Sequence, residues 1–145
     1  MIDLDTYPIF SSHLSNLRKL SLDDGKGQKI YMTQSTRDAV NFDAVKKEYI
    51  KSLGLSKVPS SNDALFDDGR GSLVFVEFKN GFISHKKKLE IWKKLYDSTL
   101  IFADITSTGI SYMRGHMKYI LVYNETVNQD NDLDADLKQK RKTAV

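Results

Sequence analysis

The spacing of hydrophobic residues predicts three helices. Leucines every few positions over about residues 10–21 predict a short amphipathic helix. Phe42 and the apolar residues three or four positions apart that follow it predict a second helix, which Gly54 ends. The same periodicity predicts a third, longer helix from Ser84 to about Phe102.

The third predicted helix has an apolar face and a basic face. We expect the apolar face to be buried, and it carries Leu89, Trp92, Leu95, Tyr96 and Thr99. Most of the remaining surface is basic, with Lys86, Lys87, Lys88, Lys93 and Lys94. Such a patch suits the phosphate backbone of a nucleic acid, although a solvated helix face gives the same pattern. Side chains spaced like Trp92 and Tyr96 are more often core contacts than base-stacking groups.

Runs of β-forming residues predict a hairpin and one further strand. The runs 63–67 and 72–79 flank the turn sequence Asp68-Gly69-Arg70-Gly71, in which Asp67 and Asp68 are expected to be turn acids. Residues 118–124 predict a buried strand, and residues 104–115 predict a looser connection before it. Residues 29–33 fit either a brief strand or a loop.

These elements predict an α/β domain, with a small mixed sheet flanked by helices. Of the 145 residues, 40% are hydrophobic, which is enough for one core but leaves little for a second. We therefore expect a single domain over residues 1–124. The charged residues 125–145 are expected to form a frayed helix or a disordered end.

Composition narrows the chemistry further. The chain has no cysteine, which excludes a disulfide scaffold, a thiolate metal site and a cysteine nucleophile. It shows no signal-peptide pattern and no apolar run of membrane-spanning length, so a cytoplasmic location is expected. The net charge of +3 is mildly basic and does not identify a partner.

Three charged residues interrupt the apolar hairpin. If the turn centres near Arg70, cross-strand partners have numbers that sum to about 140, so Asp63 lies opposite Glu77. Lys79 is two residues beyond Glu77 and points to the same face. Two carboxylates and a backbone carbonyl, such as that of Phe78, make an oxygen site suited to Mg²⁺ or Mn²⁺. A neighbouring ammonium can orient water or stabilise charge on a phosphate.

The spacing of Asp63 and the Glu77-Phe78-Lys79 triplet resembles the signature of the PD-(D/E)xK, or restriction-endonuclease-like, nuclease superfamily. The predicted order of elements over about residues 42–123 is also similar: a helix, the hairpin, a second helix and a strand. The residue before Asp63 is Asn62, where the family often has proline. The resemblance implies a restriction-endonuclease-like core.

The resemblance also implies a metal-dependent nuclease that hydrolyses phosphodiester bonds of DNA or RNA. Asp63 and Glu77 would then bind Mg²⁺ or Mn²⁺, and Lys79 would assist the attacking water. The family often adds an acid from the preceding helix, for which Glu48 is the first candidate and Asp43 the second.

Other interpretations of the same residues stay open. A non-catalytic binding or immunity-type module on a nuclease-like fold fits the small size of the chain, and a homodimer or a partner protein is compatible with either function. A structural domain without a ligand is the third interpretation, in which Glu77 and Lys79 form an ion pair at the end of the sheet and Asp63 caps a strand or turn.

Overall fold

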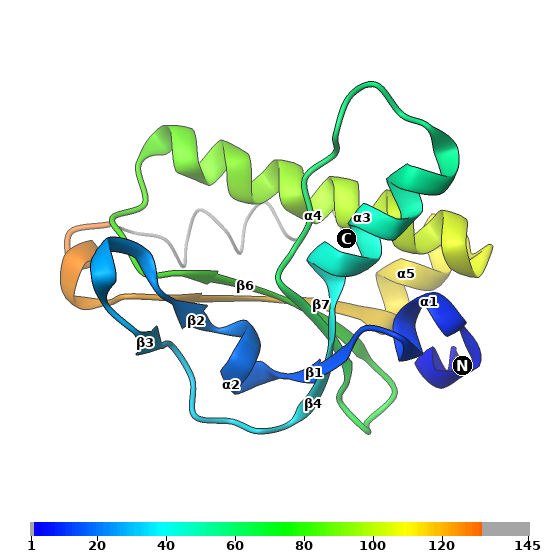
Figure 1. Ribbon diagram of the computed structural model, residues 1–145, viewed down its shortest axis with the longest axis horizontal. Helices are drawn as coiled ribbons and strands as arrows, with labels where there is room; N and C mark the ends of the chain where they lie inside the picture. The colour runs from blue at the N-terminus through cyan, green and yellow to red at the C-terminus, as the bar shows by residue number, and fades with distance from the viewer. Residues whose placement is uncertain (1, 132–145) are drawn as a thin grey trace.

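The computed structural model describes residues 2–131 and contains a five-stranded mixed sheet flanked by helices (Figure 1). The strands lie in the order β1 (Leu14–Asn16), β4 (Asp38–Asn41), β5 (Ala64–Asp67), β6 (Leu73–Lys79) and β7 (Met117–Tyr123). Neighbouring strands are antiparallel except for β6 and β7, which are parallel. The predicted α/β class with a mixed sheet is therefore confirmed.

The predicted hairpin is present in the expected register. Ala64 on β5 lies opposite Val76 on β6, as a turn centred near Arg70 requires. The side chains of Asp67 and Asp68 accept hydrogen bonds from backbone N–H groups within the turn, at 2.8 Å from Gly69 and 2.7 Å from Arg70. Both acids therefore serve the turn, as predicted.

Two long helices begin at the predicted positions, and the first of them also ends at its predicted signal. Helix α3 (Phe42–Leu53) starts where the Asn41 side chain accepts a hydrogen bond from the Ala44 N–H, and ends at Gly54 with a φ of 61°. Helix α4 (His85–Thr106) starts after Ser84, whose side chain caps it, and continues past the predicted end at Phe102. It follows β6 in the chain and lies over one face of the sheet (Figure 1).

Three predicted elements differ from the structure. Residues 118–124 were expected to form a buried strand, but β7 (Met117–Tyr123) is an edge strand and none of its residues is buried. Residues 10–21 do not form one helix, because backbone pairing of β1 with β4 separates the short helices α1 (Pro8–Ser11) and α2 (Leu17–Leu20). Residues 104–115 are not a loose connection either. They contain the end of α4 and most of α5 (Ile110–His116), which follows a turn at Ser107, where φ is 55°.

Smaller elements complete the described chain. Strand β3 (Ile30–Tyr31) pairs with β2 (Leu22–Asp23), so the strand interpretation of residues 29–33 is confirmed. Short 3-10 helices lie at η1 (Leu4–Thr6), η2 (Gly25–Gly27) and η3 (Thr126–Asn128). No helix among residues 2–131 has both the length and the apolar character needed to cross a membrane.

The sheet has an apolar core on each face. Leu73 and Phe75 of β6 belong to the larger core, which includes residues of α1, α3, α4 and α5. Val74 and Val76 point to the opposite face, which Leu17 of α2 helps to cover. Figure 1 shows α3, α4 and α5 on one side of the sheet and α2, β2 and β3 on the other. The burial of both faces of β6 explains its continuous apolar sequence.

The predicted buried face of α4 was wrong in part. Leu95 is buried as expected, but Leu89 is 51% exposed and Tyr96 is 44% exposed. The residues that α4 buries are Ile91, Leu95, Ser98, Ile101, Phe102 and Thr106. Ser98 and the half-buried Lys94 are polar, so hydropathy alone does not identify them as covered positions.

The first residues after β7 contact the connection between β6 and α4. Asn128 is buried, and its side-chain oxygen accepts a hydrogen bond of 2.9 Å from the Ile83 N–H. Its side-chain amide donates to the carbonyl oxygens of Gly81 and Asn124. The remainder of the predicted charged tail, 132–145, lies outside the described residues.

Candidate functional site

Two carboxylates lie beside each other at the carboxyl end of β6. The Asp63 N–H donates to the Val76 carbonyl at 3.0 Å, and the Asp63 side chain accepts a hydrogen bond of 2.8 Å from the Phe78 N–H. Asp63 directly precedes the first strand pair, Ala64 and Val76, and its two bonds to β6 hold it beside Glu77. Glu77 is fully buried. The structure thus brings the two predicted acids together.

Two ammonium groups approach the same oxygen of Glu77. Lys94 Nζ lies 2.6 Å from Glu77 Oε2, and Lys79 Nζ lies 3.6 Å from it. Lys79 comes from the same strand and Lys94 from α4, which covers this face of the sheet. Each lysine side chain is 24% exposed, whereas that of Glu77 is 1% exposed. The lysines therefore form the partly exposed side of the cluster.

Buried polar groups surround the other oxygen of Glu77. The Asn62 side-chain amide is 3.4 Å from Glu77 Oε1 and donates a hydrogen bond of 3.2 Å to the Tyr119 hydroxyl. The Asn62 N–H donates to the buried Ser98 hydroxyl of α4 at 2.8 Å. Asn62 Oδ1 is buried and has no hydrogen-bond partner in the part of the chain that the structure describes.

Burial and charge set the ionisation of this group, which we call the Glu77 cluster: Asn62, Asp63, Glu77, Lys79, Lys94 and Tyr119. Burial and the neighbouring Glu77 charge raise the pKa of Asp63 to about 6, although the Phe78 N–H and the two lysines act in the opposite direction. Burial opposes the charge on Lys94, but the Glu77 carboxylate outweighs this effect and raises the pKa of Lys94. Burial, with Glu77 nearby, also raises the pKa of Tyr119.

The candidate third acids on α3 lie elsewhere. The Glu48 carboxylate is exposed and lies 3.3 Å from Nε2 of His13. The Asp43 side chain accepts a hydrogen bond of 3.1 Å from the hydroxyl of Ser61, two residues before Asp63. The Asp43 carboxylate also forms ion pairs with Lys46 and Lys47. Within residues 2–131, no three His, Cys, Asp or Glu side chains come together in a way that would hold a metal ion.

The predicted basic patch on α4 divides into two parts. Lys86 and Lys87 are exposed in the first turn, and Lys88 is half-buried just behind them. Lys93 and Lys94 instead contact acids, since Lys93 Nζ lies 2.7 Å from Asp97 and Lys94 belongs to the Glu77 cluster. Lys86 and Lys87 thus keep the exposed basic character that the sequence indicates, whereas the charges of Lys93 and Lys94 are paired with acids.

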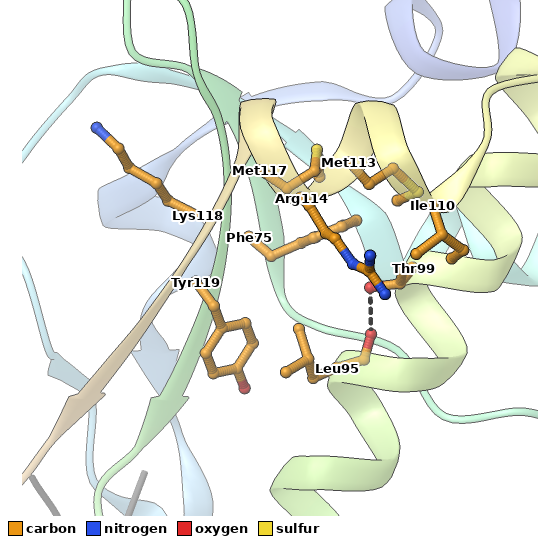
Figure 2. Close-up of a pocket in the computed structure, with 9 residues that line it drawn as sticks. All are labelled: Phe75, Leu95, Thr99, Ile110, Met113, Arg114, Met117, Lys118 and Tyr119. Carbon is orange, nitrogen blue, oxygen red and sulfur yellow. Dashed lines mark hydrogen bonds between the residues drawn. The ribbon is translucent and has the colours of Figure 1, made fainter. Parts of the chain in front are cut away.

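A small apolar cavity lies beside the cluster, between α4, α5 and β7 (Figure 2). Its volume of about 20 Å³ leaves room for about one water molecule. Leu95 and Thr99 border it from α4 and Tyr119 from β7, while the Arg114 side chain extends toward Thr99 (Figure 2). It is too small for a nucleotide or another organic ligand.

Asn62, Lys94 and Tyr119 were not predicted as members of this cluster. In the sequence, Asn62 is the residue before Asp63 and Lys94 is one lysine of a basic face, and neither pattern indicates a buried contact. Tyr119 lies in the predicted strand 118–124, where alternation could have placed it on the covered face.

No protein-family model matches the chain, and neither the curated proteins nor the solved structures include a match to it.

Proposed function

We propose that the protein is a metal-dependent nuclease that hydrolyses phosphodiester bonds of nucleic acid at the Glu77 cluster. The observation that carries this proposal is the position of Asp63, just before β5, beside Glu77 on β6, with Lys79 on the same face as Glu77. The sequence resemblance to the PD-(D/E)xK superfamily assigns roles to these three residues and implies a restriction-endonuclease-like core.

The donor groups fit a hard divalent cation such as Mg²⁺ or Mn²⁺. Asp63 and Glu77 supply carboxylate oxygens, and the Phe78 carbonyl would be a third ligand. Asn62 Oδ1 is an additional hard oxygen that lacks a partner among residues 2–131. Burial and the neighbouring Glu77 charge raise the pKa of Asp63, and a bound cation would oppose both effects. When bound, the metal would polarise the phosphodiester and lower the pKa of a bound water.

The side chains of the cluster would have different roles in the hydrolysis. Asp63 and Glu77 would hold the cation, and Lys79 would orient the attacking water or stabilise negative charge on the phosphate. Lys86 and Lys87, which are exposed, would contact the nucleic-acid backbone, since α4 begins close to the carboxyl end of β6 (Figure 1). Lys93 and Lys94 have acidic partners and are less suited to this contact.

Cleavage assays test the proposal directly. The protein would be incubated with duplex DNA, single-stranded DNA and RNA, with Mg²⁺, Mn²⁺ or a chelator. We expect metal-dependent cleavage that falls about 100-fold or more in Glu77→Gln and Lys79→Met. Glutamine keeps the shape of the buried Glu77 side chain, which alanine would not. Lys93→Met is the matched control, and full activity in Glu77→Gln would contradict the assigned roles.

A second function is favoured by the ion pairs of Glu77. Because two ammonium groups already balance the two carboxylates, the same cluster would also serve a non-catalytic binding or immunity-type module. This alternative predicts that neither Mg²⁺ nor Mn²⁺ binds at millimolar concentration and that no nucleic acid is cleaved. Titration calorimetry with each metal distinguishes the two functions.

A further inference from the structure

Lys94 holds the position at Glu77 in which a metal ion would be expected. Its ammonium is 2.6 Å from Glu77 Oε2, a full ångström closer than that of Lys79. A distance of 2.6 Å is that of a strong charge-assisted hydrogen bond. The same oxygen therefore already has a tightly bound positive charge that belongs to the protein.

A divalent cation and this ammonium exclude each other. Mg²⁺ binds carboxylate oxygens at about 2.1 Å, so an ion on Glu77 Oε2 would lie within a few ångströms of Lys94 Nζ. Two positive charges at that separation repel strongly where water is scarce. The second oxygen, Oε1, faces the Asn62 amide and offers a less open approach.

Lys94 has a route away from the carboxylate. Its side chain is 24% exposed, although it starts from the covered side of α4, next to the buried Leu95. A lysine side chain is flexible and strongly hydrated, so its ammonium can turn toward solvent while the helix stays in place. Lys93, its neighbour on the same helix, makes no contact with Glu77 in the described structure and pairs with Asp97.

We propose that Lys94 is an internal counter-ion that competes with the divalent cation for Glu77, so that metal binding releases the Lys94 ammonium from the cluster. This inference rests on the proposed function, because it concerns the metal of that same site. It assigns Lys94 a role different from the lysines at the start of α4: it sets the metal affinity of the site and does not serve as a fixed contact for the nucleic-acid backbone.

The first test measures Mn²⁺ binding by titration calorimetry, without nucleic acid. We expect Lys94→Gln to bind Mn²⁺ about tenfold more tightly than the unchanged protein, because one competing charge-assisted bond is lost. Lys94→Arg keeps the positive charge and should bind Mn²⁺ no more tightly than the unchanged protein. Lys93→Gln is the matched control for the loss of one charge on α4, and circular dichroism verifies that each variant is folded.

The second test uses the unchanged protein and does not depend on the folding of a variant. Lysines are acetylated briefly with an amine-reactive reagent, with and without Mg²⁺, and modification at each lysine is measured by mass spectrometry. We expect modification of Lys94 to increase severalfold in Mg²⁺, while that of Lys93 stays constant.

The outcomes separate this inference from the proposed function. If the unchanged protein binds Mn²⁺ but Lys94→Gln binds it equally or less tightly, and Mg²⁺ leaves Lys94 modification unchanged, competition is refuted and the nuclease proposal stands. If the unchanged protein fails to bind but Lys94→Gln binds, the competition is supported in its strongest form. If no variant binds a metal, both proposals fail and the non-catalytic module is favoured.

Discussion

Lys94 of α4 and Glu77 of β6 form a contact of 2.6 Å between the middle of a long helix and the covered face of the sheet. Glu77 is fully buried, so this contact supplies the nearest counter-charge to a carboxylate that has almost no access to water. The same pair thereby links the stability of the fold to the chemistry proposed for the site.

Removal of the Lys94 ammonium is expected to destabilise the protein. Lys94→Met leaves Glu77 with only the more distant Lys79, and the free energy of unfolding should fall by roughly 3 kcal/mol, as for other broken buried pairs. Lys93→Met removes a largely exposed ion pair and should change it by less than about 1 kcal/mol. Urea denaturation monitored by circular dichroism measures both values, and equal effects of the two variants would contradict this account of the cluster.

Asp63 should make stability depend on pH in a defined window. Its pKa is about 6 in the folded protein and 3.8 when unperturbed, so the folded state binds more protons between these values. The free energy of unfolding should therefore decrease by roughly 2–3 kcal/mol as the pH rises from about 4 to about 6. Asp63→Asn cannot ionise and should lack this decrease. Denaturation curves at several pH values test this, and parallel profiles for the two proteins would disprove it.

Two glycines should respond oppositely to substitution by alanine. Gly54 ends α3 with a φ of 61°, which alanine disfavours, so Gly54→Ala should cost about 1 kcal/mol. Gly115 lies within α5, where an added Cβ meets no atom within 4 Å, so Gly115→Ala should stabilise the protein by about 0.5–1 kcal/mol. Thermal and urea unfolding of the two variants provide the comparison.

The lysines at the start of α4 should affect nucleic-acid binding through salt dependence. If Lys86 and Lys87 each contact a phosphate of a duplex, the slope of log affinity against log salt should fall by about 0.9 per lysine in Lys86→Gln/Lys87→Gln. Lys51→Gln/Lys57→Gln removes two exposed charges near and beyond the end of α3 and should leave the slope unchanged. Fluorescence anisotropy in Ca²⁺ across a salt series measures both slopes. If Lys86→Gln/Lys87→Gln has the same slope as the control variant, Lys86 and Lys87 do not belong to the proposed interface.

Local signals in the sequence predicted the parts of the fold that depend on neighbouring residues. Asn41 and Gly54 bound α3 because their side-chain and backbone chemistry acts within one helical turn. The turn acids and the β-forming runs on either side of them likewise predicted the hairpin register, and with it the proximity of Asp63 and Glu77. The predicted helix is absent over Leu14–Asn16 because these residues pair with β4. This contact joins distant parts of the sequence, and hydrophobic periodicity does not detect it.

The rest of the candidate site depends on contacts between distant elements. A hydropathy pattern predicts that Lys94 is exposed. Its partly buried position is favourable because its ammonium pairs with the Glu77 carboxylate beneath α4. Glu48 illustrates the converse, because its place on the predicted helix was right while its side chain extends to His13. Secondary structure can therefore be predicted correctly while the direction of a functional side chain is not.

The parallel pairing of β7 with β6 has a consequence for how the protein folds. The hydrogen bond from Asn62 to Tyr119 joins residues 57 positions apart, across the whole of α4. Contacts of such high sequence separation close late, since the intervening chain must first lose much of its freedom. During synthesis, Asp63 and Glu77 would thus remain hydrated until the last strand docks, and a chain truncated before Met117 should leave them accessible to water.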